Sequence, residues 1–568
     1  MSFIIIMKNL EIARILYEIA EMLEVQEVAF KPQAYRKAAR NIETLSKDIQ
    51  EIADEGRLKE IPGVGESIAE KVEEYLDTGQ IKYFKELKKK MPYDIEGMGN
   101  IEGLGPKTIN LLYRKLGTKT VEQLKKAAQK GKIRQIKGLG PKTEENILKR
   151  MAYSTTKRFV LGFILPEAEE LKEYLKQGGE VEKVELAGSI RRRKETIGDL
   201  DILVISKDHK KTMERFVHYP DVKDILGQGN TKSSIILKND VHVDLRVVEN
   251  KSFGAAMQYF TGNKDHNILL RRIAIEKGCK LNEYGLFKGK KYIAGKNEKE
   301  IYNKLGLQYI PPEMRTNTGE LELAKKKKIP KLIELKDIQG DLHVHSNYSD
   351  GSASIKEIAL TAKKLGYKYI AITDHHGKVM IANPLDTKRL KKQFKEIDKV
   401  NKQISGLTIL KGAEVDVVAD GSLLINEKIR KELDVVVASV HSKFKMDKES
   451  MTDRIIKAMD SAHIIGHPTG RLLNKREGYD VNINRLAKAA KEKKVFLEIN
   501  SWPERSDLNG DKVREANKVG CKFSIDTDSH AVNQLKFMAL GVSIARRAGL
   551  TKNEVINTYS LDKLKKHL

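Results

Sequence analysis

Cysteine is nearly absent from the sequence, with only Cys279 and Cys521 among 568 residues. Two cysteines so far apart form neither a disulfide framework nor a cysteine-based zinc motif, and this favours a reducing compartment. Long apolar runs are missing too: none approaches the roughly 18 residues that cross a membrane. Phe3–Met7 is too short for the apolar region of a signal peptide. We therefore expect a cytoplasmic protein without a membrane partner.

Acidic residues are in the minority, because 79 Asp and Glu face 105 Lys and Arg and leave a net charge of +26. Such a balance is typical of proteins that bind polyanions, including nucleic acids. Lysine enrichment also marks some thermophilic proteins, so charge alone does not establish a nucleic-acid partner. The length predicts about three to five domains, which excludes a small stapled scaffold.

The pattern of apolar residues changes twice along the chain. Residues 1–150 carry apolar side chains at spacings of three and four, which predicts helices throughout. The region after about residue 180 mixes β-branched runs with helical stretches. Pro311-Pro312 and the charged run Lys325–Lys328 mark a boundary. Beyond residue 338 short strands alternate with helices, which predicts parallel strands and an α/β barrel.

A glycine-containing turn recurs three times in the helical region. Ile61–Gly65, Ile101–Gly105 and Ile136–Gly140 share the pattern apolar-x-Gly-x-Gly, and a helical pattern follows each. Glycine permits a positive φ, and N–H groups at a helix start can bind phosphate oxygens. The turns predict helix-hairpin-helix motifs that grip DNA without reading its sequence. The residues expected to contact DNA are Gly63, Gly65, Gly103, Gly105, Lys107, Gly138, Gly140 and Lys142.

Residues 187–205 combine a Gly-Ser turn with an Asp-x-Asp pattern on a predicted strand. Alternate side chains of a strand share a face, so Asp199 and Asp201 project together, and Asp244 could join them from a neighbouring strand. Three convergent carboxylates repel one another unless cations lie between them, as in two-metal phosphoryl transfer. The Gly188-Ser189 turn and Arg192 would supply donors to a triphosphate. Asp-x-Asp alone is often a solvated strand end, but the combination is more specific.

Histidine is also scarce, yet nine of the 13 histidines lie beyond residue 340. Most of them directly follow apolar strands, at the edge where α/β barrels assemble their sites. Imidazole and carboxylate together suit Zn²⁺, Mn²⁺ or Fe²⁺, and so many candidate ligands predict two or three ions. The segments concerned are Asp341–Ser346, Thr373–His376, Gly412–Glu414, Ser439–Ser442, Ile465–Pro468 and Asp526–His530.

The central motifs resemble the nucleotidyltransferase core of a family X, polymerase beta-like DNA polymerase. The resemblance rests on residues 187–205, Asp244, Tyr259–Gly262 and Asn282–Leu286, and covers roughly residues 8–315. It implies that Asp199, Asp201 and Asp244 bind two Mg²⁺ or Mn²⁺ ions and that DNA and dNTPs are partners. Lys264 departs from an acidic residue of vertebrate members. The nucleotide contacts that the resemblance implies are Gly188, Ser189, Arg192, Gly198, Tyr259, Phe260, Gly262, Asn267 and Arg271.

The same resemblance singles out Lys71, which aligns with the Schiff-base lysine that removes a 5′-deoxyribose phosphate in some members. Tyr35, expected to contact DNA, also agrees with the family pattern, whereas Phe30 and Ser67 replace basic side chains. A nucleophilic lysine needs a lowered pKa. In a lysine-rich chain, a solvated helix residue is the alternative reading.

The C-terminal motifs resemble a polymerase-and-histidinol-phosphatase (PHP) domain over about residues 338–568. This resemblance implies a distorted (β/α)7 barrel with an active metal site. His376 is an alternative to its neighbour His375, which we favour as the ligand, and a purely structural metal site is the other reading. The implied ligands are His343, His345, Asp350, His375, Glu414, His441, His467, Asp528 and His530.

Taken together, the sequence predicts a multidomain α and α/β enzyme of bacterial or archaeal type. We expect the first part to be a DNA-directed DNA polymerase that fills short gaps in base excision repair. The second part is expected to be a metal-dependent 3′-5′ exonuclease or 3′-phosphatase that also incises abasic sites. We expect a monomer acting on gapped or nicked duplexes and primer 3′ ends. A phosphatase of small phosphate esters with a vestigial polymerase, and a non-catalytic binder of DNA ends, are the alternatives. The expected divisions are a helical DNA-binding domain at 1–90, further hairpins at 91–152, a mixed α+β nucleotidyltransferase palm at 153–246, a C-terminal polymerase subdomain at 247–316, a linker at 317–337 and the barrel at 338–568.

Overall fold

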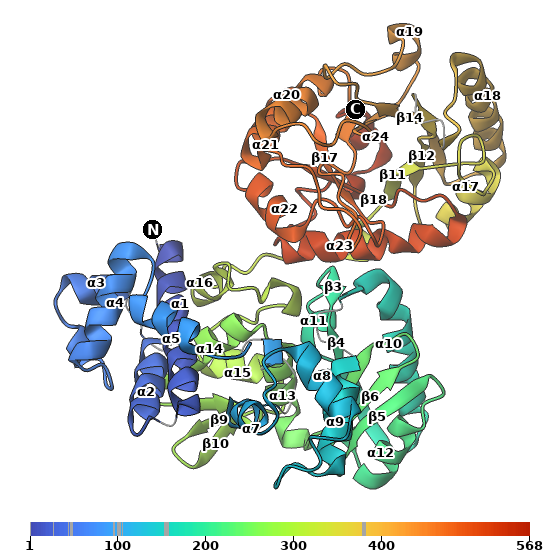
Figure 1. Cartoon of the computed structure of the whole chain (residues 1–568). Helices are drawn as coiled ribbons and strands as arrows, with labels where there is room; N and C mark the ends of the chain where they lie inside the picture. Colours follow the sequence, from blue (N-terminus) through green and yellow to red (C-terminus); the bar gives the residue numbers. More distant parts are fainter. Residues whose placement is uncertain are drawn as a thin grey trace.

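The computed structural model describes residues 2–568 apart from 27, 44, 46–48, 95–96, 99–103, 105, 153–157 and 378–381. Figure 1 shows two lobes: the first 330 or so residues form the lower lobe, and the C-terminal barrel lies above it. Among the described residues, no helix is both long and apolar enough to span a membrane.

Helices form the N-terminal part of the lower lobe. They are α1 (Ser2–Val25), α2 (Lys31–Glu43), α3 (Ile49–Asp54), α4 (Glu66–Thr78) and α5 (Lys82–Lys90). Their apolar faces share one core, in which Ile12, Leu16 and Ile19 of α1 are completely buried. The spacing of three and four places these side chains on one face of the helix, and burying that face drives the helices together.

A second helical core follows, built from α7 (Pro106–Leu116), α8 (Val121–Gln129) and α9 (Pro141–Ala152). Val25 at the end of α1 joins this core. Thr120 caps α8 by accepting a hydrogen bond from the N–H of Gln123, which satisfies one of the open donors of a helix start.

The region predicted to be the palm contains a five-stranded sheet with the strand order β2-β4-β7-β6-β5, and we use the name palm for this region below. Its strands are β2 (Val181–Leu186), β4 (Asp199–Ser206), β5 (Val222–Gln228), β6 (Lys232–Leu237) and β7 (His242–Val247). Helices α10 (Leu161–Lys176) and α12 (His209–Val217) contribute to its core, and the short strands β1 (Phe159–Val160) and β3 (Thr196–Ile197) pair beside it. Strand β4 runs parallel to β7, whereas the other neighbours are antiparallel.

The next unit contains α13 (Phe253–Thr261), α14 (Lys264–Glu276), a sheet of β8 (Lys280–Asn282), β9 (Gly285–Lys288) and β10 (Lys291–Ala294), and α15 (Glu298–Lys304). Residues 317–337, expected to be a linker, are folded against it. They form α16 (Glu320–Lys325), and Leu321, Ala324 and Leu332 lie in the same core. Lys325–Lys328 are exposed, as their charge predicts.

The C-terminal lobe is a barrel whose strand order is β11-β12-β14-β15-β16-β17-β18, with all neighbours parallel. A parallel bridge between Val344 and Ser529 joins its two ends. This confirms the predicted distorted seven-stranded barrel. The strands are β11 (Gly340–Val344), β12 (Tyr369–Ile372), β14 (Thr408–Asp416), β15 (Val435–Ser439), β16 (Ile464–Ile465), β17 (Phe496–Asn500) and β18 (Phe523–Asp526), with β13 (His375–His376) paired to β14.

Helices form the outer layer of the barrel (Figure 1). They include α17 (Ile355–Lys364), α18 (Thr387–Gln403), α20 (Lys448–Ala458), α21 (Ile483–Lys493), α22 (Gly510–Asn517) and α23 (Met538–Arg547), with the short α19 (Glu427–Arg430) and α24 (Leu561–Lys565). The barrel strands are almost entirely buried, as their continuous apolar runs predict.

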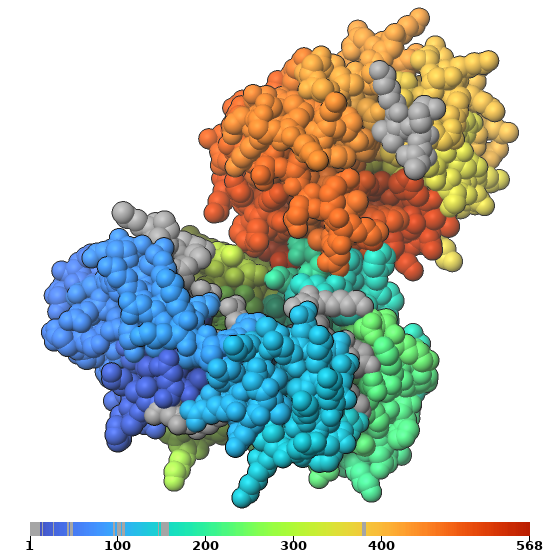
Figure 2. Space-filling view, viewed as in Figure 1, coloured from blue at the N-terminus to red at the C-terminus, as the bar shows by residue number. Residues whose placement is uncertain are grey.

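The two lobes meet where α23 lies on the palm (Figures 1 and 2). Leu540 of α23 belongs to the palm's own core. A Cβ atom at Gly162 of α10 would lie 2.7 Å from Leu540 Cδ1 and 2.8 Å from Pro503 Cβ, so only glycine allows this approach. Arg546 Nε lies 2.8 Å from Glu313 Oε1. Apolar and charged contacts therefore both join the lobes.

Candidate active sites

The three palm aspartates lie at the start of two parallel strands. Asp201 of β4 is the register partner of Asp244 of β7, and Asp199 precedes Asp201 on β4. Burial, together with the charges of Asp199 and Asp244, raises the pKa of Asp201 to about 7. A carboxyl group whose ionisation is opposed by its neighbours gains from a nearby cation.

Asp244 is surrounded by hydrogen-bond donors and cations. Lys232 Nζ lies 2.8 Å from Asp244 Oδ2, His242 Nε2 lies 3.3 Å from Oδ1, and Ser234 donates a hydrogen bond to Oδ1. Burial alone would raise the pKa of Asp244, but these contacts lower it below the usual value. Asp244 is thus held as a carboxylate.

Carboxylate oxygens are the ligands that Mg²⁺ prefers, and the crowded charge of this trio fits divalent cations. The trio does not, however, form a group whose ligand atoms all lie within 4.8 Å of one another. Among the described residues, such groups occur in the C-terminal barrel.

Gly188 brings the Gly-Ser turn against the aspartates. Its φ is +61°, and a Cβ atom there would lie 2.4 Å from Asp201 Oδ2, so a side chain is excluded. The turn continues into α11 (Gly188–Arg191), which carries Ser189 and leads into Arg192. Gly198 lies just before β4. The predicted triphosphate donors therefore border the carboxylates.

The arginines after this turn reach the Tyr-Phe-Thr-Gly segment at the end of α13. Arg192 donates to the carbonyl of Thr261, and Arg191 Nη1 donates to Thr261 Oγ1 at 2.6 Å. Burial, with repulsion from Arg547 of α23, lowers the pKa of Arg192 to about 10. The barrel thus places a cation near the predicted triphosphate donors.

The remaining predicted nucleotide contacts are linked to one another. Asn267 Nδ2 donates to the carbonyl of Tyr259 at 2.7 Å, and Arg271 Nε donates to the carbonyl of Asn267 at 3.3 Å. Phe260 lies under the guanidinium of Arg246 at 4.7 Å, and Gly262 follows with φ at +67°. The ring of Tyr259 is 37% exposed and can contact a ligand. Lys264 begins α14.

A buried ion network fixes this segment to the palm. Glu298 lies 2.6 Å from both Arg191 and the completely buried Arg315. Glu298→Ala would leave two poorly solvated guanidinium groups without their carboxylate, so we expect a loss of about 3–5 kcal/mol in the free energy of unfolding. Urea titration of the variant against the exposed control Glu322→Ala measures it. Equal midpoints for the two variants would contradict the expectation.

The structure describes the first and third of the predicted glycine turns, and the second only in part. Gly63 has φ at +91°, and its missing side chain lets Lys37 and Ala38 of α2 approach; Gly65 is the N-cap of α4. Gly138 has φ at +95° and Gly140 precedes α9. Gly103 and Gly105, and the side chains of Lys107 and Lys142, lie outside the described residues.

Lys71 and Tyr35 lie together in the N-terminal helices. Tyr35 is only 5% exposed and stacks on Tyr83 at 6.5 Å, so little of it can face DNA. Lys71 Nζ donates to the carbonyl of Ser67 at 2.8 Å and lies over the Tyr83 ring at 4.8 Å. Partial burial lowers the pKa of Lys71, the direction that a nucleophilic amine needs.

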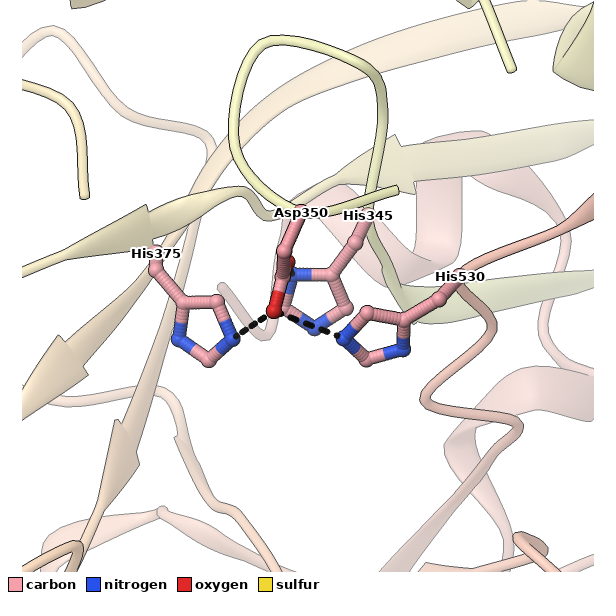
Figure 3. Close-up of side chains that lie close together, drawn as sticks. All are labelled: His345, Asp350, His375 and His530. Atoms are coloured by element: carbon pink, nitrogen blue, oxygen red, sulfur yellow. Dashed lines mark ion pairs between the residues drawn. The ribbon is translucent and has the colours of Figure 1, made fainter. Parts of the chain in front are cut away.

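The predicted barrel ligands converge at the carboxyl ends of the strands. In Figure 3, Asp350 lies between two imidazoles, with Oδ2 at 3.5 Å from His375 Nε2 and 3.4 Å from His530 Nε2. His345 lies behind it, and its Nε2 is 3.2 Å from Asp528 Oδ1.

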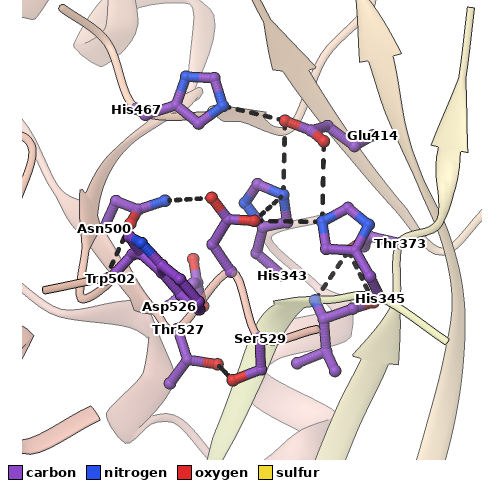
Figure 4. Close-up of polar contacts among 12 residues, drawn as sticks. His343, His345, Thr373, Glu414, His467, Asn500, Trp502, Asp526, Thr527 and Ser529 are labelled. Atoms are coloured by element: carbon purple, nitrogen blue, oxygen red, sulfur yellow. Dashed lines mark hydrogen bonds and ion pairs between the residues drawn. The ribbon is translucent and has the colours of Figure 1, made fainter. Parts of the chain in front are cut away.

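Glu414 lies close to several of the ligand imidazoles, and Figure 4 shows its contacts with His343, His345 and His467. Its carboxylate oxygens are 2.8 Å from His375, 3.1 Å from His467, 3.3 Å from His441 and 3.5 Å from His343. Burial would raise the pKa of Glu414, but the imidazoles hold it well below the usual value.

Among the residues that the structure describes, three overlapping groups offer ligand atoms within 4.8 Å of one another. They are His345-Asp350-His375-His530, His343-His345-Asp528 and His375-Glu414-His441. Because His345 and His375 each belong to two groups, the arrangement fits neighbouring cations rather than one. His376 points elsewhere, with Nδ1 2.6 Å from the carbonyl of Leu385, so the structure places His375 in the cluster.

Several residues around the ligands were not predicted. Glu498 Oε1 lies 2.7 Å from His343 Nδ1, Asp416 Oδ1 lies 2.7 Å from His441 Nδ1, and Asn500 Nδ2 donates to Asp528 at 3.1 Å. Such partners fix the orientation of ligand imidazoles. A sequence signal existed for Glu498, which is an acid within an apolar buried strand.

Proton competition sets the pH dependence of cation binding. Burial alone would lower the pKa of His375 and His441, but Glu414 and other carboxylates raise them to about 10 and about 9. In protein stripped by a chelator both are therefore protonated at pH 7, and a cation must displace these protons.

We accordingly expect affinity for Mn²⁺ or Zn²⁺ to rise with pH up to about 9, by up to ~tenfold per unit for each displaced proton. Calorimetric titration at pH 6, 7 and 8 measures the affinity, and buffers of different ionisation enthalpy count the protons released. A constant affinity across this range would contradict the argument.

Comparison with known proteins relates four parts of the chain to known domains. Family models match as a helix-hairpin-helix domain over residues 7–81, a SAM-like helix-hairpin-helix tandem over 95–151, a DNA polymerase beta thumb over 256–316 and a PHP domain over 341–502. The "DNA polymerase/3'-5' exonuclease PolX" of Bacillus subtilis is 36% identical over 564 residues, which are 98% of each chain.

The chain belongs to the PolX family. Two further relatives each match a part of it. DNA polymerase lambda of Rattus norvegicus is 25% identical over 54% of this chain and 56% of its own. A "Probable phosphatase" of Thermoanaerobacter sp. is 31% identical over 40% of this chain and 93% of its own. Membership of the PolX family confirms the predicted resemblance, the fold class and the prediction that the chain is an enzyme.

Proposed function

We propose that this chain is a DNA-directed DNA polymerase with 3′-5′ exonuclease activity, and that the palm and the barrel each hold one active site. The observation that carries the proposal is the presence of two separate acid-rich sites, the aspartates on the neighbouring strands β4 and β7 of the palm and the His/Asp/Glu groups around Glu414 in the barrel. The matched hairpin domains and the net charge of +26 support DNA as the common substrate.

In the palm, Asp199, Asp201 and Asp244 would hold two Mg²⁺ or Mn²⁺ ions. Bound there, the ions would stabilise the charge of the phosphoryl group being transferred. Ser189 and Arg192 would orient the triphosphate, because the turn that carries them borders Asp201. Tyr259 would contact the sugar, and Asn267 and Arg271 would lie along the new base pair.

In the barrel, the nine converging side chains would hold two or three Zn²⁺, Mn²⁺ or Fe²⁺ ions. These would act as Lewis acids toward a phosphate ester. Glu498 and Asp416 would keep the imidazoles of His343 and His441 oriented. Elemental analysis of purified protein tests the identities and numbers of the ions.

A gapped duplex, labelled at the primer 5′ end, tests both activities. With Mg²⁺ or Mn²⁺ and dNTPs the primer should lengthen, and without dNTPs it should shorten. A primer unchanged in both conditions, with hydrolysis of p-nitrophenyl phosphate, would favour the alternative of a small-ester phosphatase. Binding without any chemistry would favour a DNA-end binder.

The proposal also covers the substrates, the further activities of the barrel and the oligomeric state. We propose gapped or nicked duplexes and primer 3′ ends as substrates in base excision repair, 3′-phosphatase and abasic-site incision as further barrel activities, and a monomer. The two free thiols support a reducing cytoplasm. The domain division predicted from the sequence is also kept as a proposal, except that residues 317–337 pack with the preceding unit and are not a linker.

Lys71 is proposed to act as a 5′-deoxyribose-phosphate lyase. Its lowered pKa and its contact with Tyr83 support this role. Borohydride should therefore trap the wild type on a duplex that carries a 5′-deoxyribose phosphate. We expect Lys71→Ala to lower trapping by at least ~100-fold, since the Schiff base needs the amine. Undiminished trapping in that variant, with Lys85→Ala as the lysine control, would refute the role.

A further inference from the structure

Arg505 extends from the turn after β17 to the rim of the metal-ligand cluster. Its Nε atom lies 3.1 Å from Asp528 Oδ2, and its side chain keeps 20% of its surface exposed. Trp502 begins the same turn, and its ring lies 6.2 Å from the ring of His530. The turn therefore lines the cluster with a guanidinium group and an aromatic ring.

The surroundings of the Arg505 guanidinium suit an anion. Asp528 is already shared, because His345 lies 3.2 Å from Oδ1 and Asn500 donates to Oδ2. Cations held by this carboxylate would repel a neighbouring guanidinium unless negative charge lay near both. A phosphate supplies that charge, and the planar fork of arginine binds two of its oxygens.

The turn is also attached to the palm. Arg471 Nε donates to the carbonyl of Arg505 at 2.9 Å, and Arg471 Nη2 donates to the carbonyl of Ser506. The same guanidinium lies 3.9 Å from Glu195 Oε1, and Glu195 also pairs with Arg547. Burial would raise the pKa of Glu195, but these two arginines lower it, so it stays ionised.

We infer that Arg505 binds a non-bridging oxygen of the DNA phosphate cleaved in the barrel, and that Arg471 of the barrel and Glu195 of the palm are positioning residues that hold Arg505 there. This inference rests on the proposed exonuclease function. In that reaction the phosphorus–O3′ bond of the last linkage breaks and the oxygen of a water molecule joins phosphorus. One water proton goes to the departing O3′, and the products are a nucleoside 5′-monophosphate and a shortened 3′-hydroxyl end.

The first test measures steady-state shortening of a 5′-labelled single strand. We expect Arg505→Ala to lower kcat/KM by about 10- to 100-fold, mainly through KM, as for loss of a charge-assisted hydrogen bond. Arg505→Lys should restore part of the loss. Arg485→Ala, which removes an exposed arginine paired with Glu449 and Asp453, is the matched control and should match the wild type.

Two readouts separate phosphate binding from metal or folding effects. The metal content of Arg505→Ala, measured by elemental analysis, should equal that of the wild type, and its primer extension should persist. The anisotropy of a labelled single strand should show weaker binding. Lost metal, unchanged KM or unchanged binding would each overturn the inference.

The positioning role is tested by a double-mutant cycle. Arg471→Ala and Glu195→Gln should each raise KM for the strand. If they act through Arg505, then combining either with Arg505→Ala should add almost nothing to the loss from Arg505→Ala alone. Additive losses would overturn the role.

The wild type separates failure of the proposed function from failure of the inference. If the wild type itself fails to shorten DNA, the proposed function fails. If the wild type shortens DNA but Arg505→Ala does so equally well, only the inference fails.

Discussion

Asp201→Asn is expected to lower the kcat of primer extension by at least ~10³-fold, because it removes a carboxylate that would bind the catalytic ions. Asp201 is the register partner of Asp244 and is in contact with the Gly188 turn, so the substitution acts where metal and triphosphate would meet. The amide is isosteric and hydrogen-bonds its neighbours, so the palm should stay folded. Incorporation of a labelled nucleotide into a gapped duplex measures the loss.

The exonuclease of the same variant is the internal control. The barrel contributes none of these ligands, so shortening of a single strand should equal that of the wild type. Asp221→Asn is the matched control in the palm. Asp221 precedes the edge strand β5 and pairs with Lys238, so this variant should extend the primer as the wild type does. Simultaneous loss of both activities in Asp201→Asn would contradict the presence of two separate sites.

Glu414→Gln is expected to have the opposite result, with exonuclease activity lowered by at least ~10³-fold and primer extension retained. Glu414 contacts the imidazoles of His375, His441 and His467 and is the carboxylate that those residues share. An amide cannot supply the negative charge that offsets bound cations. Elemental analysis should therefore show less transition metal per chain, and strand shortening measures the activity.

Glu427→Gln is the control for this variant, since Glu427 is exposed and pairs with Arg430 on the outer helix α19. It should retain both metal and activity. A Glu414→Gln protein with a full complement of metal and normal exonuclease activity would show that the cluster is not the nuclease site.

The barrel ligands could be predicted because strand order and residue type carry the information. In a parallel barrel every strand ends at the same rim. A histidine that follows an apolar strand can therefore be assigned to that rim from the sequence alone, before the packing of the side chains is known. His343 and Glu414 are 71 positions apart in the chain, yet His343 Nε2 lies 3.5 Å from Glu414 Oε1. The palm carboxylates follow the same logic, because β4 and β7 are parallel neighbours.

The supporting residues could not be predicted in this way. Asp416 and Arg505 are ordinary surface residue types in sequence, and only the tertiary structure shows which of them face the ligands. The role of residues 317–337 was missed for a related reason. Their charge and proline content indicate a solvated linker, whereas the few apolar side chains, Leu321 among them, are enough to attach the segment to the neighbouring core.

Contacts between the lobes were likewise outside the reach of sequence patterns. Gly162 lies within a helix, where glycine is unfavourable, and only its closeness to Leu540 and Pro503 explains it. Glu195 and Arg547 are 352 positions apart, and no sequence pattern links the two residues.

The placement of Leu540 in the core of the palm has an evolutionary consequence. Deleting the barrel would remove part of the palm's interior and leave an apolar surface beside Gly162, while an isolated barrel would expose Leu540 itself. Splitting the gene of this chain between the lobes would therefore leave an apolar patch on both products, so polar substitutions on each side of the contact would have to accompany the split.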